Sequence, residues 1–220
     1  MPLPLNGRIS RRDLQLRAIS LPAPLALLVL HQRSAGLAFA QDSDAESTPS
    51  LAPTPTCRDD DDVEETVAQT EGPYFTPNSP ERTSLREPRM TGTPLRVTGY
   101  VYASGCDPVP GALLDFWHCD DAGNYDNEGY RLRGHQFAGD DGQFTLETIR
   151  PGIYPGRTRH IHVKVQAPGG PILTTQLYFP DEPENDRDRI FDSSLVMDIE
   201  PTTGENSEVT AFFTFVVDAG

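Results

Sequence analysis

Short apolar runs separated by turn residues fill the chain from residue 95 onward, and they constrain its fold more than any other feature. The runs LRVTGYVY, ALLDFW, QFTLETI, HIHVKVQA, TTQLYF and AFFTFVV resemble half-buried strands in length and alternation. Stretches rich in Pro and Gly, such as RPGIYPG and APGGP, separate them, and no stretch of twelve residues keeps a helical period. The pattern predicts an all-β fold, an antiparallel β-sandwich core with long loops.

The N-terminal region lacks this pattern and has the features of an export signal. RISRRDLQLR at 8–17 contains the twin arginine Arg11-Arg12, an apolar run follows, and AFA at 38–40 offers a small-x-small cleavage site. The apolar run is too short to span a bilayer, which needs about 20 residues. We therefore predict a twin-arginine-type signal over 1–40 and a periplasmic or extracellular protein. The alternative is a disordered basic N-terminus.

Residues 41–69 are rich in Asp, Glu, Ser, Thr and Pro, and have few apolar residues. We predict a disordered acidic linker there, followed by the sandwich domain at 70–220. The formal net charge is −15, and because residues 1–40 hold five Arg and one Asp, the remainder carries −19. This charge argues against nucleic acid and anionic membranes as partners. A homo-oligomer stays open.

The three cysteines allow at most one internal disulfide. Cys106 lies in a predicted turn and Cys119 at the far end of the following strand, which separates them by about 26 Å at the usual strand rise. Bridged Cα atoms must lie within about 7 Å. We therefore predict a Cys57–Cys106 disulfide and a free Cys119.

The stretch RTRHIHVKV at 157–165 is the first candidate for chemistry. His160 and His162 share one face of a strand, so they could bind one ion together. An H-x-H pair alone is more often a surface or hydrogen-bonded pair. No C-x-x-C motif is present, so further ligands would be oxygen donors, and Tyr125 and Tyr154 lie in nearby loops. A loop tyrosine is itself more often a packing residue.

Six motifs occur in the order found in one enzyme family: TEGPYF (70–75), PVPGALLDFWHCDDAGNY (108–125), YRLRG (130–134), DDGQFTLETIRPGIYP (140–155), RTRHIH (157–162) and TTQLYF (174–179). Over about 70–183 the chain resembles the intradiol ring-cleavage dioxygenases. The resemblance implies one Fe(III) per chain on a β-sandwich core. Hard phenolate oxygens favour Fe(III) over Fe(II). The metal ligands that it implies are Tyr125, Tyr154, His160 and His162.

The resemblance also implies catalytic roles for Arg157, Tyr154 and Gln176. A fixed guanidinium at Arg157 would stabilise charge on the ring carbon that dioxygen attacks, although a surface ion pair is its simplest role. Tyr154 would leave the metal and take a substrate proton. Gln176 would orient a ligand or a bound hydroxide, unless it is an ordinary cross-strand residue. The loop between Tyr154 and His160 is several residues shorter than in the family, and Arg159 replaces a small residue.

The expected function is therefore oxidative cleavage of a catechol-type diol by dioxygen to a cis,cis-muconate-type product. TEGPYF is expected to form a turn with Tyr74 and Phe75 covering the sandwich. One alternative is a metal-free binding or carrier module of the same fold. Another is a copper or zinc site that combines the H-x-H pair with His118 or His135, as in a superoxide dismutase-like sandwich. The sequence does not identify the diol.

Overall fold

The computed structural model of the protein describes residues 64–200 and 208–220. The predicted export signal, linker residues 41–63 and Cys57 lie outside these residues. The described residues form strands and short 3-10 turns, and contain no helix long and apolar enough to cross a membrane. The strands are β1 (Pro94–Ala103), β2 (Leu113–Trp117), β3 (Arg133–Phe137), β4 (Gln143–Ile149), β5 (His160–Gln166), β6 (Ile172–Tyr178), β7 (Asp198–Ile199) and β8 (Val209–Val217).

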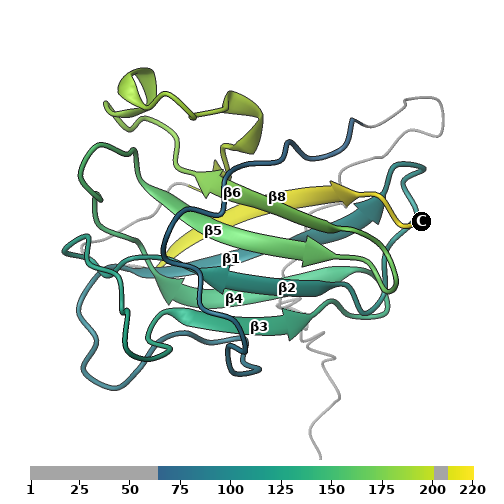
Figure 1. Ribbon diagram of the computed structural model, residues 1–220, viewed down its shortest axis with the longest axis horizontal. Helices are drawn as coiled ribbons and strands as arrows, with labels where there is room; N and C mark the ends of the chain where they lie inside the picture. Colours follow the sequence, from purple (N-terminus) through teal and green to yellow (C-terminus); the bar gives the residue numbers. More distant parts are fainter. Residues whose placement is uncertain (1–63, 201–207) are drawn as a thin grey trace, which may run out of the picture. The chain divides into compact units, whose positions relative to one another are not determined.

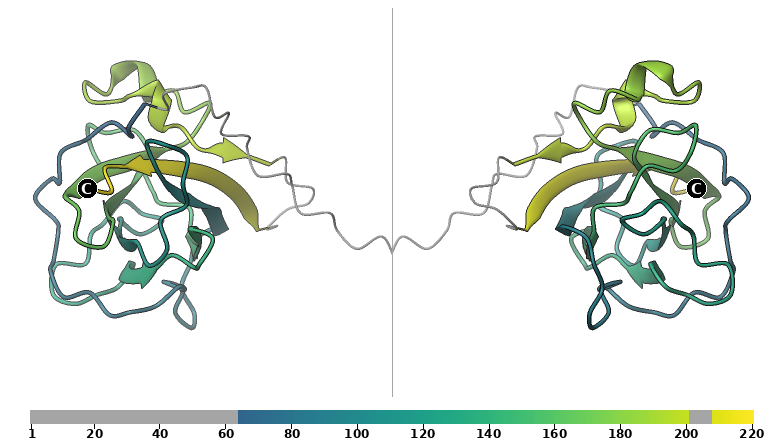
Figure 2. Two further views of the ribbon diagram at one scale, coloured as in Figure 1. Left: turned by 90° about the vertical axis from the view of Figure 1, so that its right-hand side faces the viewer. Right: turned by 90° about the vertical axis from the view of Figure 1, so that its left-hand side faces the viewer.

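The strands form two sheets that pack face to face, which confirms the predicted β-sandwich (Figure 1). One sheet has the order β3-β2-β5-β6 and the other the order β4-β1-β8-β7. Residues 179–197 connect β6 of the first sheet to β7 of the second (Figure 2). This connection carries the 3-10 turns η1 (Asn185–Arg187) and η2 (Ser193–Leu195).

One pairing differs from the predicted antiparallel arrangement. β1 and β8 run parallel, with Leu95 opposite Val209, whereas the other strand pairs are antiparallel. Short turns force antiparallel pairing only between strands that are neighbours in sequence. The first and last strands of the domain are joined by most of its length, so turn chemistry does not set their direction.

Alternation along β5 separates the core from a second, polar face. Ile161, Val163 and Val165 point into the core between the sheets. His160 and His162 point to the opposite face, yet each is only 3% exposed. A further layer must therefore cover the outer side of this sheet.

Residues 66–84 supply that layer and are called the covering segment below. They cross all four strands of the first sheet, in front of β5 and β2 in Figure 1. The amide of Gln69 donates to the Thr174 carbonyl of β6 (2.8 Å), and the amide of Arg82 donates to the His135 carbonyl of β3 (2.8 Å). Between them, Phe75 lies under the Lys164 ammonium, 3.5 Å from the ring centroid. TEGPYF thus covers the sandwich as expected.

The cysteines lie in different environments. Cys106 is disulfide-bonded, whereas Cys119 is a free thiol that is 1% exposed. Burial raises the pKa of Cys119 to about 11, so its thiol is protonated and unreactive at neutral pH.

Candidate active site

Two neutral imidazoles meet on the outer face of β5. The Nε2 atoms of His160 and His162 lie 3.2 Å apart. His160 donates through Nδ1 to the Thr158 carbonyl (2.6 Å), so the proton is on Nδ1 and Nε2 keeps a lone pair. Burial, with the positive charge of Arg157, lowers the pKa of His160 to about 4 and holds that of His162 well below its ordinary value. Both rings are therefore uncharged at neutral pH.

Trp117 fixes the plane of the second imidazole. It lies opposite His162 in the β2–β5 pair, and the two rings stack with centroids 4.8 Å apart and planes 7° apart. Phe75 of the covering segment packs edge-on against Trp117 at 4.9 Å. The sequence alone does not place Trp117 beside His162, because this contact depends on the register of β2 against β5.

Tyr125 reaches the histidines from the loop after β2. Asp120 stabilises this loop by accepting hydrogen bonds from the amides of Ala122 (3.0 Å) and Asn124 (2.9 Å). The Tyr125 hydroxyl then lies 3.3 Å from Nε2 of His160. Burial raises the pKa of Tyr125 above its ordinary value, although the charge of Arg157 opposes the shift.

Tyr154 approaches from the turn before β5 and meets a tyrosine of the covering segment. The hydroxyls of Tyr154 and Tyr74 lie 2.8 Å apart. The Tyr74 ring stacks on Tyr125, with centroids 4.4 Å and planes 16° apart. Tyr125 and Tyr154 meet edge-on at 5.8 Å. The structure thus gathers three tyrosines, and the third, Tyr74, received no chemical role from the sequence.

Two glycines allow the loops that carry Tyr125 and Tyr154 to touch backbone to backbone. A Cβ on Gly123 would lie 2.4 Å from the Ile153 carbonyl oxygen, and a Cβ on Gly152 would lie 2.5 Å from the Gly123 nitrogen. Gly123 also has φ +86°, a conformation that favours glycine. The amide of Gly152 donates to the Asp120 carbonyl at 2.7 Å. Any larger residue at either position would push the two tyrosines apart.

Arg157 and Gln176 lie together beside the histidines. Arg157 donates through Nη2 to Oε1 of Gln176 (2.7 Å) and through Nε to Asp188 (2.8 Å). Gln176 is fully buried, and its Nε2 donates to the Thr70 carbonyl of the covering segment (2.9 Å). Arg159 instead forms an ion pair with Glu182 (2.7 Å). The two arginines therefore have separate surroundings although they are two residues apart.

The two other histidines have partners of their own. His118 is 1% exposed and lies 2.7 Å from both the Cys119 carbonyl and the Thr148 hydroxyl. His135 lies 3.2 Å from the Ser79 hydroxyl. In the described part of the chain, neither residue forms a hydrogen bond with His160 or His162.

The donor set fits a small hard ion. Two ligands about 2.1 Å from one ion and about 100° apart lie about 3.2 Å from each other. The separations from Tyr125 to His160 (3.3 Å) and from His160 to His162 (3.2 Å) match this value. Nδ1 of His162 is buried and has no partner in the described part of the chain. No cluster of three His, Cys, Asp or Glu side chains occurs there, so a metal here needs tyrosine oxygens.

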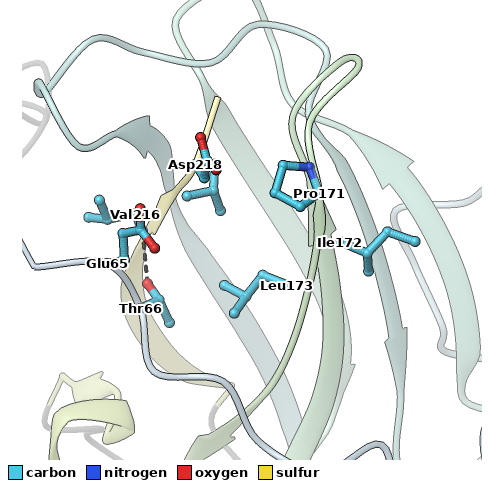
Figure 3. A pocket seen from close by; sticks show the side chains of 8 residues that line it. Glu65, Thr66, Pro171, Ile172, Leu173, Val216 and Asp218 are labelled. Carbon is cyan, nitrogen blue, oxygen red and sulfur yellow. Dashed lines mark hydrogen bonds between the residues drawn. The ribbon is translucent and has the colours of Figure 1, made fainter. Parts of the chain in front are cut away.

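Two cavities flank the Tyr154 turn. One, of about 280 Å³, is lined by the three tyrosines together with Asn124 and Asn127. The other, of about 340 Å³, is lined by Ile153, Gly156 and Arg157, and by charged residues of the η1 segment. A smaller cavity of about 190 Å³ lies elsewhere, between Thr66, Leu173 and Val216 (Figure 3), and none of the candidate residues lines it. A further cavity of about 280 Å³ is lined by Asn124, Tyr125 and Arg131. A ligand could therefore approach the site through this cavity or through the two beside the Tyr154 turn.

Comparisons with known proteins agree with this architecture. The sequence model of a family described as Dioxygenase matches residues 70–218. A chlorocatechol 1,2-dioxygenase of Rhodococcus opacus is 30% identical over 56% of this chain and 60% of its own. A catechol 1,2-dioxygenase of Candida albicans is 29% identical over 54% of this chain and 49% of its own. The chain thus spans about half to three fifths of these relatives.

Solved structures give the same result. The dioxygenase domain of a dioxygenase carbohydrate-binding protein fusion from Streptomyces sp. SirexAA-E is 54% identical, with a TM-score of 0.68 over 71% of this chain and all of that domain. A 3-chlorocatechol 1,2-dioxygenase from Rhodococcus opacus 1CP is 26% identical, with a TM-score of 0.64 over 69% of this chain and 71% of its own. With the family model matching most of the sandwich, the chain belongs to the intradiol ring-cleavage dioxygenase family.

Proposed function

We propose that the protein is a non-haem Fe(III)-dependent enzyme that cleaves a catechol-type diol with dioxygen. One observation carries the proposal: Nε2 atoms of two neutral imidazoles and a tyrosine hydroxyl converge at ligand spacing on one sheet face. The family is generally dependent on non-haem iron. Tyr125, Tyr154, His160 and His162 would hold one ferric ion per chain. When bound, this ion would make the chelated diol ring reactive toward dioxygen.

The tyrosines would handle the protons of the diol. Tyr154 lies in the turn that lines the first cavity, so its side chain can move without disturbing β5. In this proposal its Oη takes one substrate proton, while the Tyr74 hydroxyl at 2.8 Å keeps it oriented. Tyr125 is fixed by the loop that Asp120 stabilises and stays beside His160.

Arg157 would act on the charge that develops on the substrate ring. Its side chain is 20% exposed, and Asp188 and Gln176 hold its Nε and Nη2 beside the histidines that would bind the metal. A prepositioned cation in a site that excludes water stabilises such charge without reorganisation. Gln176 would keep Arg157 aimed at the ring through the 2.7 Å hydrogen bond.

Catechol-type substrates are proposed because similar proteins are named for catechol, chlorocatechol and hydroxyquinol. The first cavity presents tyrosines and the amides of Asn124 and Asn127, which suit a neutral aromatic diol. The product would be a cis,cis-muconate-type diacid. We also propose the export signal at 1–40, a linker from residue 41, the domain at 70–220 and the Cys57–Cys106 disulfide as stated for the sequence. Residues 66–69 of the predicted linker belong to the covering segment, because the amides of Thr66 and Gln69 donate to carbonyls of β8 and β6.

Metal analysis and visible absorption of the purified protein test the proposal. We expect about one iron per chain, a tyrosinate-to-Fe(III) absorption band and oxygen uptake with catechol. Tyr125→Phe and His162→Ala should each lose iron or the band. Tyr130→Phe is the control, because the Tyr130 hydroxyl donates to the Pro77 carbonyl (3.0 Å) outside the donor set. A colourless wild-type protein that takes up no iron would favour the metal-free binding module instead.

A further inference from the structure

The buried carboxylate of Asp188 binds the guanidinium of Arg157 through its Nε. Oδ2 of Asp188 accepts from Arg157 Nε at 2.8 Å and from the Thr158 amide at 2.9 Å. Its other oxygen accepts from the Ile190 amide at 3.2 Å. The Asp188 side chain is 2% exposed, whereas that of Arg157 is 20% exposed. Both residues border the second cavity, and the carboxylate is the more deeply buried of the two.

Asp188 is charged despite its burial. Burial raises its pKa, but the hydrogen bonds from the two amides and from Arg157 lower it by more, so the pKa lies below its ordinary value. An ionised carboxylate with donors on both oxygens has little freedom to rotate. It can therefore fix the orientation of the arginine that it binds.

The two terminal nitrogens of the Arg157 guanidinium, Nη1 and Nη2, differ in their hydrogen bonds. Nη2 donates to Gln176 Oε1 at 2.7 Å and lies 3.4 Å from the Tyr178 hydroxyl. Nη1 has no hydrogen-bond partner within residues 64–200 and 208–220. Because Asp188 and Gln176 hold two corners of a planar group, the position of the third corner is determined as well.

We propose that Asp188 is a positioning residue for the ring-cleavage reaction: by fixing Nε of Arg157, it aims the free Nη1 edge at the bound diol. This inference rests on the proposed function, in which Arg157 stabilises charge on the substrate. Asp188 forms no hydrogen bond with a proposed metal ligand in the described part of the chain; its partners are Arg157 and the amides of Thr158 and Ile190. Its effect on turnover should therefore pass through Arg157, whereas an effect through Thr158 and His160 would appear as loss of iron.

A double-mutant cycle on the full-length protein tests this dependence. Asp188→Asn keeps the size of the side chain but removes its charge. The side-chain NH2 group of the asparagine would then face a hydrogen-bond donor where the carboxylate oxygen accepted a bond. We expect Asp188→Asn to retain iron and the resting spectrum and to lower kcat by about tenfold or more, with a smaller change in KM. In an Arg157→Ala background, Asp188→Asn should change kcat less than about twofold.

Asp192→Asn is the matched control. Asp192 lies in the same connection and its carboxylate accepts from the Ser194 amide at 2.9 Å, as an end cap of η2, without binding an arginine. It should leave kcat near the wild-type value. If Asp188→Asn lowers kcat equally with and without Arg157, or not at all, the inference is refuted while the proposed function stands. A wild-type protein that binds no iron or cleaves no diol refutes both.

Discussion

Gly123→Ala is the sharpest test of how the site is assembled, because it adds a single methyl group where two loops touch. Gly123 lies two residues before Tyr125, and its α-carbon faces the backbone just before Tyr154. The substitution changes no side chain of the donor set. Any effect on the site must therefore come from the spacing of the loops.

The expected size of the effect follows from two contributions. Alanine at φ +86° costs about 1–2 kcal/mol, because an L side chain is strained in that region. In addition, the new Cβ would lie 2.4 Å from the Ile153 oxygen, whereas side-chain contacts under 3.0 Å essentially do not occur. The loops must then separate by at least about 0.6 Å. A misplacement approaching 1 Å at a reacting centre can lower the rate by about 10²-fold.

Gly169→Ala separates these contributions. Gly169 has φ +79°, close to the value at Gly123, but a Cβ there would meet nothing within 4 Å. It should therefore lose the same conformational energy without moving any loop. We expect Gly169→Ala to lower the free energy of unfolding in urea by about 1–2 kcal/mol and to leave turnover intact.

Gly123→Ala should be destabilised further, by about 1–2 kcal/mol beyond the control, since close backbone contacts relax only partly. Its catechol turnover should fall by about ten- to a hundredfold, with a weaker visible band per iron. If the two variants match in stability, spectrum and turnover, the Gly123 contact does not set the spacing of the tyrosines.

Two other predictions concern single side chains. Tyr74→Phe keeps the ring that stacks on Tyr125 but removes the hydrogen bond to Tyr154. The visible band should therefore move to longer wavelength with iron retained, and turnover should fall several-fold. An unshifted band would contradict this role of Tyr74. Burial lowers the pKa of His118 to about 4, and an unfolded histidine titrates near 6.5, so unfolding gains a proton between these values. His118 should therefore contribute a fall in the free energy of unfolding on the order of 3 kcal/mol as pH drops from about 6.5 to about 4, in addition to that from His160 and His162, and His118→Asn should remove this part of the slope. Equal slopes in urea titrations would refute it.

The strands with apolar alternation could be predicted from the sequence, but two others could not. β3, with the sequence RGHQF, has little apolar pattern and owes its conformation to pairing with β2, where Phe137 lies opposite Leu113. β7 has only two residues and exists through its pairing with β8. Long-range pairing of this kind leaves no local signal.

The candidate site also contains some residues that the sequence predicts and others that it does not. The H-x-H spacing alone places His160 and His162 on one face, while the motif resemblance selects Tyr125, Tyr154, Arg157 and Gln176. The hydrogen bond between Tyr74 and Tyr154 and the ion pair of Asp188 with Arg157 join residues far apart in sequence. Their side chains meet only because the covering segment and the η1 connection fold over the same sheet. No periodicity or turn signal predicts such contacts.

The parallel pairing of β1 with β8 has a consequence for the order of folding. Nine residue pairs from Leu95–Val209 to Ala103–Val217 join the first strand of the sandwich to the last. Such non-local pairings have a high loop-closure entropy, so they slow folding. During synthesis the second sheet lacks its central β8 strand until Val209–Val217 have left the ribosome. Until then β1 presents an unpaired edge that can associate with other chains, so premature termination before Val209 should yield aggregated protein rather than a smaller stable domain.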